Sequence, residues 1–491
     1  KYTTAIEVFI VGAWYKPGAT IKSFFDEKAS SMKSFFEEQR SRLESALISS
    51  YEGAVKMKDS VNNYFDEQQK KISNDINNYM ESVKQNGKKV VDSWSYLPSD
   101  ETGSRLDNPD MVLPVPAIIS RHGYTCETHT VISEGYVLNI HRIPRSKSST
   151  DVPSKTVLLQ HGLFASSADW ILNGPEKALA YVLSEAGYDV WMSNIRGNRY
   201  CKDHAWLKTD SKAYWNFSWH DVALHDIPAI IDYILKVKGP HTKITYMGHS
   251  MGTTILFAML TLRPEYNQIL HAGFALAPVV FMSNIKSPLK SLAPIASNVA
   301  YMEMLYGSHE FLPKNSSLGR ISSSCNVDTM DAVVCKNIIF YVCGYNQQQF
   351  NKTLLPVFLS HLGTGTSWKT AVHYAQEVVA GDKFQQFDYG ANHNQRMYGS
   401  DTPPEYDLRK VTLPIKLFWA QNDLLSDEKD VMKLYERLPS TTEIYMVPCP
   451  EFNHIDYLWA IDAPKLLNQK ILEVLKRTES NDFSFNFGFK L

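Results

Sequence analysis

The pentapeptide G-H-S-M-G at residues 248–252 is the part of the chain best suited to nucleophilic chemistry. It follows an apolar run at 243–247 and precedes an apolar run at 253–263, so Ser250 is expected in a sharp turn between a strand and a helix. A side chain at Gly248 or Gly252 would collide with the neighbouring chain in such a turn. The pattern predicts that Ser250 is a nucleophile and needs a base beside it.

The base and the group that orients it should follow in the order Asp, then His. Asp423 and His454 each come shortly after an apolar run, and His454 is the only histidine after Asp423. The sequence therefore predicts a triad of Ser250, Asp423 and His454. Two alternatives remain open: Asp423 could merely cap the helix that follows it, and Asp456, two residues after His454, could be the acid.

Two backbone N–H groups should face the negative charge that develops on the substrate oxygen. One belongs to Met251, the residue after the nucleophile, and Leu163 fits the other because its H-G-L loop follows an apolar strand at 156–160. His161 and His249 flank these positions, and we interpret them as residues that pack the loops rather than as acid–base groups.

The chain after residue 98 alternates apolar strands with helices, which is typical of a parallel sheet covered on both faces. The fold class is therefore α/β. The predicted strands span residues 156–160, 188–192, 243–247, 273–277, 415–420 and 443–447, and helices are expected at 175–186, 221–236 and 253–263.

Composition excludes several classes of protein. Fifty Lys and Arg residues balance 52 Asp and Glu residues without a long basic run, so a nucleic-acid partner is not expected. The six cysteines form no C-x-x-C pair, and no metal site or cofactor is predicted. The longest apolar stretch near the start is residues 8–15, too short to cross a bilayer. Because the chain begins at Lys1, we expect a processed secretory product.

We predict that residues 1–98 form a separate amphipathic helical extension. The segment 23–33 (S-F-F-D-E-K-A-S-S-M-K) is followed by a similar segment at 34–44 (S-F-F-E-E-Q-R-S-R-L-E), so the sequence contains an eleven-residue repeat. Such a repeat keeps an apolar stripe almost straight along a helix. Three interpretations stay open: a helical hairpin packed on the main domain, self-assembly through residues 21–94, or a helix that lies on a lipid surface.

From residue 100 to about 475 the chain resembles the acid lipase family of α/β-hydrolases, which contains the gastric and lysosomal acid lipases. The matching segments include residues 123–144, 158–169 (L-L-Q-H-G-L-F-A-S-S-A-D), 186–198, 217–221, 309–315, 386–390, 422–431 and 454–459. The resemblance implies an α/β-hydrolase fold and hydrolysis of neutral-lipid esters, with a neutral lipid or lipid surface as partner. It also implies a secreted or lysosomal glycoprotein. The extension and Met251, where the family usually has glutamine, depart from the family pattern.

The resemblance also suggests a disulfide between Cys325 and Cys335, with Cys343 reduced. Three reduced thiols are the alternative. The sequence offers glycosylation acceptors at Asn216, Asn315 and Asn351 if the chain is secreted.

The chain between Ser250 and Asp423 is far longer than the ~30 residues of a strand–helix–strand crossover, so an insertion must lie there. We predict a mainly helical cap at 284–401 over the site, a hydrolase core formed by 99–283 and 402–480, and a tail at 481–491.

Two function classes remain. One is a serine esterase that acts on neutral lipids through an acyl-enzyme. The other is a lipase-derived storage, lipid-carrier or structural protein in which the fold serves packing or lipid binding. The complete triad and both glycines favour the esterase, because a protein without a catalytic role has no use for a strained turn.

Overall fold

One eight-stranded sheet organises the part of the chain that the computed structural model describes, which comprises residues 108–299, 302, 309–311 and 339–486. The strands are β1 (Glu127–Ser133), β2 (Tyr136–Ile143), β3 (Thr156–Gln160), β4 (Asp189–Met192), β5 (Ile244–His249), β6 (Leu270–Leu276), β9 (Ile415–Trp419) and β10 (Glu443–Met446). Their order is β1-β2-β4-β3-β5-β6-β9-β10. The six predicted strands are all present, and their ends differ from the prediction by at most three residues.

The sheet is parallel from β4 to β10, as predicted, but its other edge is antiparallel. β1 pairs antiparallel with β2, and β2 pairs antiparallel with β4, so the expectation of a wholly parallel sheet is wrong at this edge. The reason is a two-residue turn at Glu134 and Gly135, whose φ angles of 48° and 90° suit a hairpin. Exposed positions alternate with more covered ones along β1, which is typical of an antiparallel strand with one solvated face.

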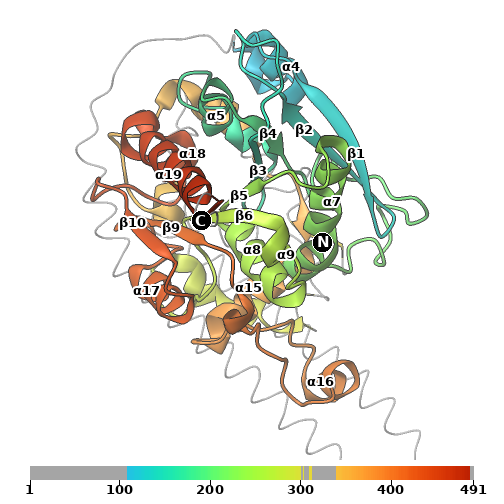
Figure 1. Cartoon of the computed structure of the whole chain (residues 1–491). Coiled ribbons are helices and arrows are strands. Elements are labelled where there is room, and N and C mark those ends of the chain that lie inside the picture. The colour runs from blue at the N-terminus through green and yellow to red at the C-terminus, as the bar shows by residue number, and fades with distance from the viewer. Residues whose placement is uncertain (1–107, 300–301, 303–308, 312–338, 487–491) are drawn as a thin grey trace, which may run out of the picture. The chain divides into compact units, whose positions relative to one another are not determined.

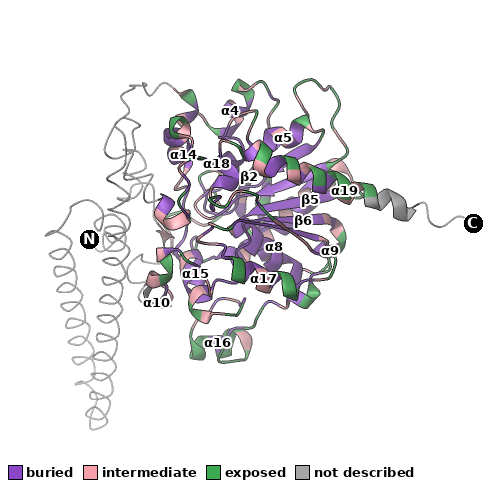
Figure 2. Ribbon diagram, turned by 90° about the vertical axis from the view of Figure 1, so that its left-hand side faces the viewer, coloured by how far each residue is buried: buried purple, intermediate pink, exposed green. Residues whose placement is uncertain are grey.

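Helices cover both faces of the sheet, as Figure 1 shows. Leu158 of β3 belongs to one buried cluster, whereas its neighbours Val157 and Leu159 belong to the other. The first cluster draws residues from α7 (Ile227–Lys238), α8 (Met251–Leu262) and α17 (Glu428–Arg437), and the second from α4 (Val115–Arg121), α5 (Leu179–Glu185) and α19 (Gln469–Asn486). The central strands and the inward helix faces are therefore buried, and the outward helix faces are exposed (Figure 2).

The predicted helices at 175–186 and 253–263 correspond to α5 and α8. The predicted helix at 221–236 is confirmed as a composite of α6 (Trp219–Asp221), the π-helical turn η3 (Val222–Asp226) and α7. Shorter elements are α9 (Tyr266–Ile269), α18 (Asp456–Trp459), the π-helical turn η7 (Pro464–Asn468), and the 3-10 turns η1 (Pro109–Met111) and η2 (Ser167–Trp170).

The chain inserted between β6 and β9 is mainly helical where the structure describes it. It contains α10 (Ala293–Ala296), α14 (Leu355–His361), α15 (Trp368–Ala380), α16 (Ala391–Tyr398), the strand pair β7 (Glu310–Phe311) and β8 (Thr366–Ser367), and the 3-10 turns η4 (Pro288–Leu292), η5 (Lys352–Leu354) and η6 (Leu408–Lys410). His373 of α15 stacks on Trp219 of the core with ring centroids 3.9 Å apart, so the insertion packs directly on the core. The boundaries at 284 and 401 stay predictions.

The extension at 1–98 lies outside the described residues, as do its repeat and the assembly through 21–94 that was predicted from it. Helix α19 continues to Asn486, so part of the predicted tail is helical. Within the described ranges, no helix combines the length and the apolar character that a membrane span requires.

Candidate active site

Ser250 lies between the end of β5 and the start of α8, as the sequence predicts. Its φ of 53° and ψ of −117° are strained for a residue with a side chain, and its N–H donates to the Leu276 carbonyl at 3.0 Å. A Cβ on Gly248 would lie 2.6 Å from Gly252, and one on Gly252 would lie 2.4 Å from the Gln160 carbonyl oxygen. Both glycines are therefore required by close backbone approach, and the turn presents the Ser250 hydroxyl.

His454 connects the other two members of the predicted triad. Its Nε2 lies 2.8 Å from Ser250 Oγ, and its Nδ1 lies 3.0 and 2.9 Å from the two carboxylate oxygens of Asp423. His454 is 4% exposed and Asp423 is 1% exposed, so little water competes for these hydrogen bonds. The geometry lets His454 accept the Ser250 proton while Asp423 holds the Nδ1–H tautomer.

The environment of Asp423 separates it from the other nearby carboxylates. Its Oδ1 also accepts the N–H groups of Leu425 and Ser426, which fixes the carboxylate against the imidazole. Asp427, not Asp423, caps α17 through a bond from the Lys429 N–H. The alternative in which Asp423 serves only as a cap of that helix is therefore wrong.

Asp456 faces its own loop rather than His454. Its Oδ2 accepts the Asn453 N–H at 2.9 Å and a bond from Asn346 Nδ2 at 2.7 Å. Burial raises the pKa of Asp456 to about 7. Asp456 is therefore a carboxylate that holds the loop in place, and Asp423 is left as the partner of the imidazole.

The two predicted oxyanion donors lie near the nucleophile. Met251 is the first residue of α8, where backbone N–H groups have no partner inside the helix. The loop that carries Leu163 touches the turn, because a Cβ on Gly162 would lie 3.2 Å from Ser250 Cβ. The donor roles of Met251 and Leu163 stay predictions. Met251 follows Ser250 directly, and Gly162, which precedes Leu163, approaches Ser250 closely.

His161 and His249 behave as packing residues. Burial lowers the pKa of His161 to about 4, and its Nδ1 bonds the Gly162 carbonyl. Burial and the neighbouring His454 lower the pKa of His249 to about 3, so both rings are neutral near pH 7. His249 Nε2 donates to the His454 carbonyl at 2.8 Å, a contact that sequence reasoning missed. This hydrogen bond joins the turn that carries Ser250 to the backbone of His454.

The predicted disulfide pair, Cys325 and Cys335, lies outside the described residues, as does Asn315. Cys343 is a free thiol. Asn216 is exposed, whereas Asn351 is half-buried and accepts the Leu354 N–H at the start of η5. Glycosylation at these two sites stays a prediction. Among the described residues, no group of three or more His, Cys, Asp or Glu side chains is arranged to hold a metal ion.

Comparisons with known proteins agree with this fold. The family model described as "alpha/beta hydrolase fold" matches residues 155–459, and the model of a "partial alpha/beta-hydrolase lipase region" matches residues 115–174. "Lipase 3" of Drosophila melanogaster is 38% identical over 365 residues, which cover 74% of this chain and 92% of that protein. "Gastric triacylglycerol lipase" of Bos taurus is 37% identical over 380 residues, 76% of this chain and 94% of that protein.

A further relative, "Lysosomal acid lipase/cholesteryl ester hydrolase" of Macaca fascicularis, is 34% identical over 390 residues, which cover 78% of this chain and 96% of that protein. The alignments therefore span nearly all of these relatives and leave out about a quarter of this chain. This chain belongs to the α/β-hydrolase lipases, in the family of the gastric and lysosomal acid lipases.

Proposed function

We propose that this protein hydrolyses carboxylic esters of neutral lipids, triacylglycerols or sterol esters, through an acyl-enzyme on Ser250. The observation that carries the proposal is the alignment of Ser250, His454 and Asp423, with every link between 2.8 and 3.0 Å. The names of the relatives supply the substrate class, since one is a triacylglycerol lipase and another a cholesteryl ester hydrolase.

In the acylation step, Ser250 Oγ attacks the ester carbonyl carbon while His454 Nε2 takes the hydroxyl proton. Asp423 stabilises the imidazolium that forms. The N–H groups of Met251 and Leu163 would receive the oxyanion, and each such donor is worth about 3 kcal/mol in the transition state. When the tetrahedral intermediate collapses, the C–O bond to the alcohol breaks and His454 gives its proton to the leaving oxygen.

In the deacylation step, water replaces the alcohol. His454 takes a proton from the water, the resulting hydroxide attacks the acyl carbon, and the fatty acid leaves as Ser250 Oγ recovers the proton. His249 stays neutral near pH 7, because burial and the neighbouring His454 lower its pKa to about 3. It therefore cannot compete with His454 for the proton, and its bond to the His454 carbonyl steadies the base.

We further infer that the protein works at a lipid surface and is secreted, with a lysosomal location as the alternative. The support is the names of the gastric and lysosomal relatives, together with an exposed acceptor asparagine at Asn216. Nothing in the described residues favours the storage, carrier or structural alternative. A strained serine at φ 53°, hydrogen-bonded to a buried imidazole, has no purpose in a carrier.

The function is tested with a fluorophosphonate probe and two emulsions, one of a triacylglycerol and one of a sterol ester. We expect the probe to label Ser250 in the native protein, and fatty acid to be released from at least one emulsion. Probe-treated protein should release none. A native protein that is not labelled and releases no fatty acid would contradict the proposal and favour the carrier.

Deletion of residues 1–98 is expected to leave hydrolysis of a short soluble ester nearly unchanged. The extension contains no histidine, and its repeat predicts an apolar stripe that would have to pack on itself, a partner or lipid. The stripe would include Phe24, Phe25, Phe35 and Phe36. The deletion should instead change the oligomeric mass in light scattering or the rate on emulsified lipid. If mass and emulsion rate stay the same, or if soluble-ester activity is lost, a hairpin docked on the main domain is favoured.

A further inference from the structure

Residues 343–349, here called the brace, belong to the chain inserted between β6 and β9 and contact both loops that carry the acid and the base. The Cys343 carbonyl accepts the His454 N–H at 3.2 Å and the Leu424 N–H at 3.4 Å. Leu424 follows Asp423 directly. One carbonyl of the brace therefore ties together the backbone of the base and the backbone next to the acid.

The next two carbonyls of the brace continue this pattern. Gly344 O accepts a bond from Asn453 Nδ2 at 2.8 Å, and Tyr345 O accepts one from Asn422 Nδ2 at 2.8 Å. Asn453 precedes His454 and Asn422 precedes Asp423. Three successive carbonyls thus bond residues that flank or include the two groups whose alignment the reaction needs.

Gly344 lets the brace approach this closely. Its φ is +117°, and a Cβ there would lie 2.1 Å from the Asn422 carbonyl oxygen and 2.9 Å from Asn453 Cβ. No other residue fits without moving the loops. The contact is therefore built into the backbone and does not depend on a mobile side chain.

The brace makes one buried side-chain bond to the loop that carries the base. Asn346, which is 2% exposed, donates from Nδ2 to Asp456 Oδ2 at 2.7 Å, and its Oδ1 accepts the Gln349 N–H. The same Asp456 oxygen accepts the Asn453 N–H at 2.9 Å. Asp456 thus transmits the position of the brace to the residue that precedes His454.

We propose that Asn346 and Asp456 are positioning residues for the hydrolysis, because their hydrogen bond fastens the brace to the loop of His454 and keeps the imidazole between Asp423 and Ser250. The inference rests on the proposed function. A displacement of about 1 Å at a catalytic group can cost about 100-fold in rate. The hydrogen bond between Asn346 and Asp456 can therefore affect the rate of hydrolysis, although neither side chain need touch the substrate.

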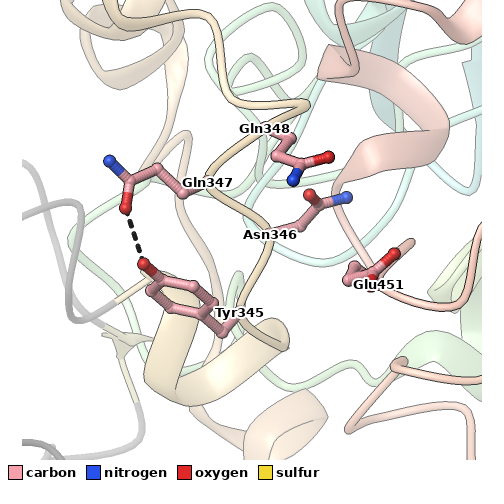
Figure 3. Close-up of a pocket in the computed structure, with 5 residues that line it drawn as sticks. All are labelled: Tyr345, Asn346, Gln347, Gln348 and Glu451. Atoms are coloured by element: carbon pink, nitrogen blue, oxygen red, sulfur yellow. Dashed lines mark hydrogen bonds between the residues drawn. The ribbon is translucent and has the colours of Figure 1, made fainter. Parts of the chain in front are cut away.

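The surroundings of Asn346 decide which substitution is informative. It lines a pocket of about 420 Å³ together with Tyr345, Gln347, Gln348 and Glu451 (Figure 3). Asn346→Asp keeps the shape and the bond from Gln349. At alkaline pH, where all rates are compared and neither carboxyl of the pair retains a proton, it removes the donor and sets two carboxylates against each other. Asp456→Ala removes the acceptor of the same hydrogen bond, so it is combined with Asn346→Asp in a double-mutant cycle. Gln348→Glu makes the same chemical change at an exposed position of the same pocket and serves as the matched control.

The experiment measures kcat and KM on a short soluble ester and the rate of labelling by a fluorophosphonate. For Asn346→Asp we expect kcat and the labelling rate to fall together, by about 30- to 100-fold, with little change in KM. Because Asn346→Asp and Asp456→Ala break the same hydrogen bond, the double variant should be hardly slower than the slower single variant, whereas Gln348→Glu should resemble the unmodified protein. A loss of packing alone would lower the melting temperature without a selective effect on kcat.

The proposal is overturned if Asn346→Asp keeps kcat within about threefold, if only KM rises, or if the losses of Asn346→Asp and Asp456→Ala multiply in the double variant. If Asn346→Asp does not fold, Asn346→Ala removes the donor without adding a charge, and the same kcat criterion applies to it. Failure of the proposed function is distinct, because then the unmodified protein is neither labelled nor active on any ester.

Discussion

Replacement of Ser250 by alanine is expected to lower ester hydrolysis by at least about 10⁴-fold, because the hydroxyl is the group that attacks and no other nucleophile occupies the turn. The protein should stay folded, since alanine accepts the same backbone better than a larger residue and Ser250 Oγ makes its described bond only to His454. The measurement is kcat/KM on a soluble ester. Fatty-acid release from an emulsion is measured as a second readout of activity, and the melting temperature checks that the variant is folded.

Residual activity above about one hundredth in a pure sample would contradict the assignment of Ser250. A second check uses the fact that Ser250 and His454 share one chemical step. The double variant Ser250→Ala with His454→Ala should be hardly slower than either single variant. Additive losses would show that one of the two residues has been assigned wrongly.

Replacement of Asp423 by asparagine is expected to lower kcat by about 10⁴-fold with little change in KM. The amide can donate to Nδ1 of His454, which favours the imidazole tautomer with its proton on Nε2, and that nitrogen could then no longer accept the Ser250 proton. The measurement is kcat at several pH values, with labelling of Ser250 by a fluorophosphonate as an independent readout of nucleophilicity.

The control for Asp423→Asn is Asp401→Asn, an equal chemical change at an exposed residue of the inserted chain. It should leave kcat unaltered. If Asp423→Asn retained most of the activity, the acid would have to be another carboxylate. Asp456 would then be the first to examine, in spite of its bonds to Asn453 and Asn346.

Much of the fold can be predicted from the sequence, because buried parallel strands consist of short, continuous runs of apolar residues. β3, β5 and β9 each bury every residue, so their runs stand out from the polar turns around them. β1 and β2 carry a weaker, alternating pattern, and the signal that could have located them is Glu134-Gly135 between two such runs. The antiparallel edge was therefore missed.

The residues of the site also fall into two groups, those that the sequence predicts and those that only the structure reveals. The sequence by itself predicted Ser250, because a strand, two glycines and a helix are all local features. It favoured Asp423 and His454 because they follow Ser250 in the order that such a turn requires, with Asp456 left open as the acid. It also placed the insertion, since the excess length between Ser250 and Asp423 can be counted. It said nothing about which residues of the insertion touch the triad.

Only the tertiary structure decided how the acid and the base are held. The bonds from Cys343 O to His454 N, from His249 Nε2 to His454 O and from Asn346 Nδ2 to Asp456 Oδ2 join segments that are far apart in the chain. Such bonds use backbone carbonyls and common polar side chains, which occur throughout the chain. No spacing of residues and no composition therefore predicts which of them will pair. Their partners become neighbours only when the inserted chain has packed against the loops that follow β9 and β10.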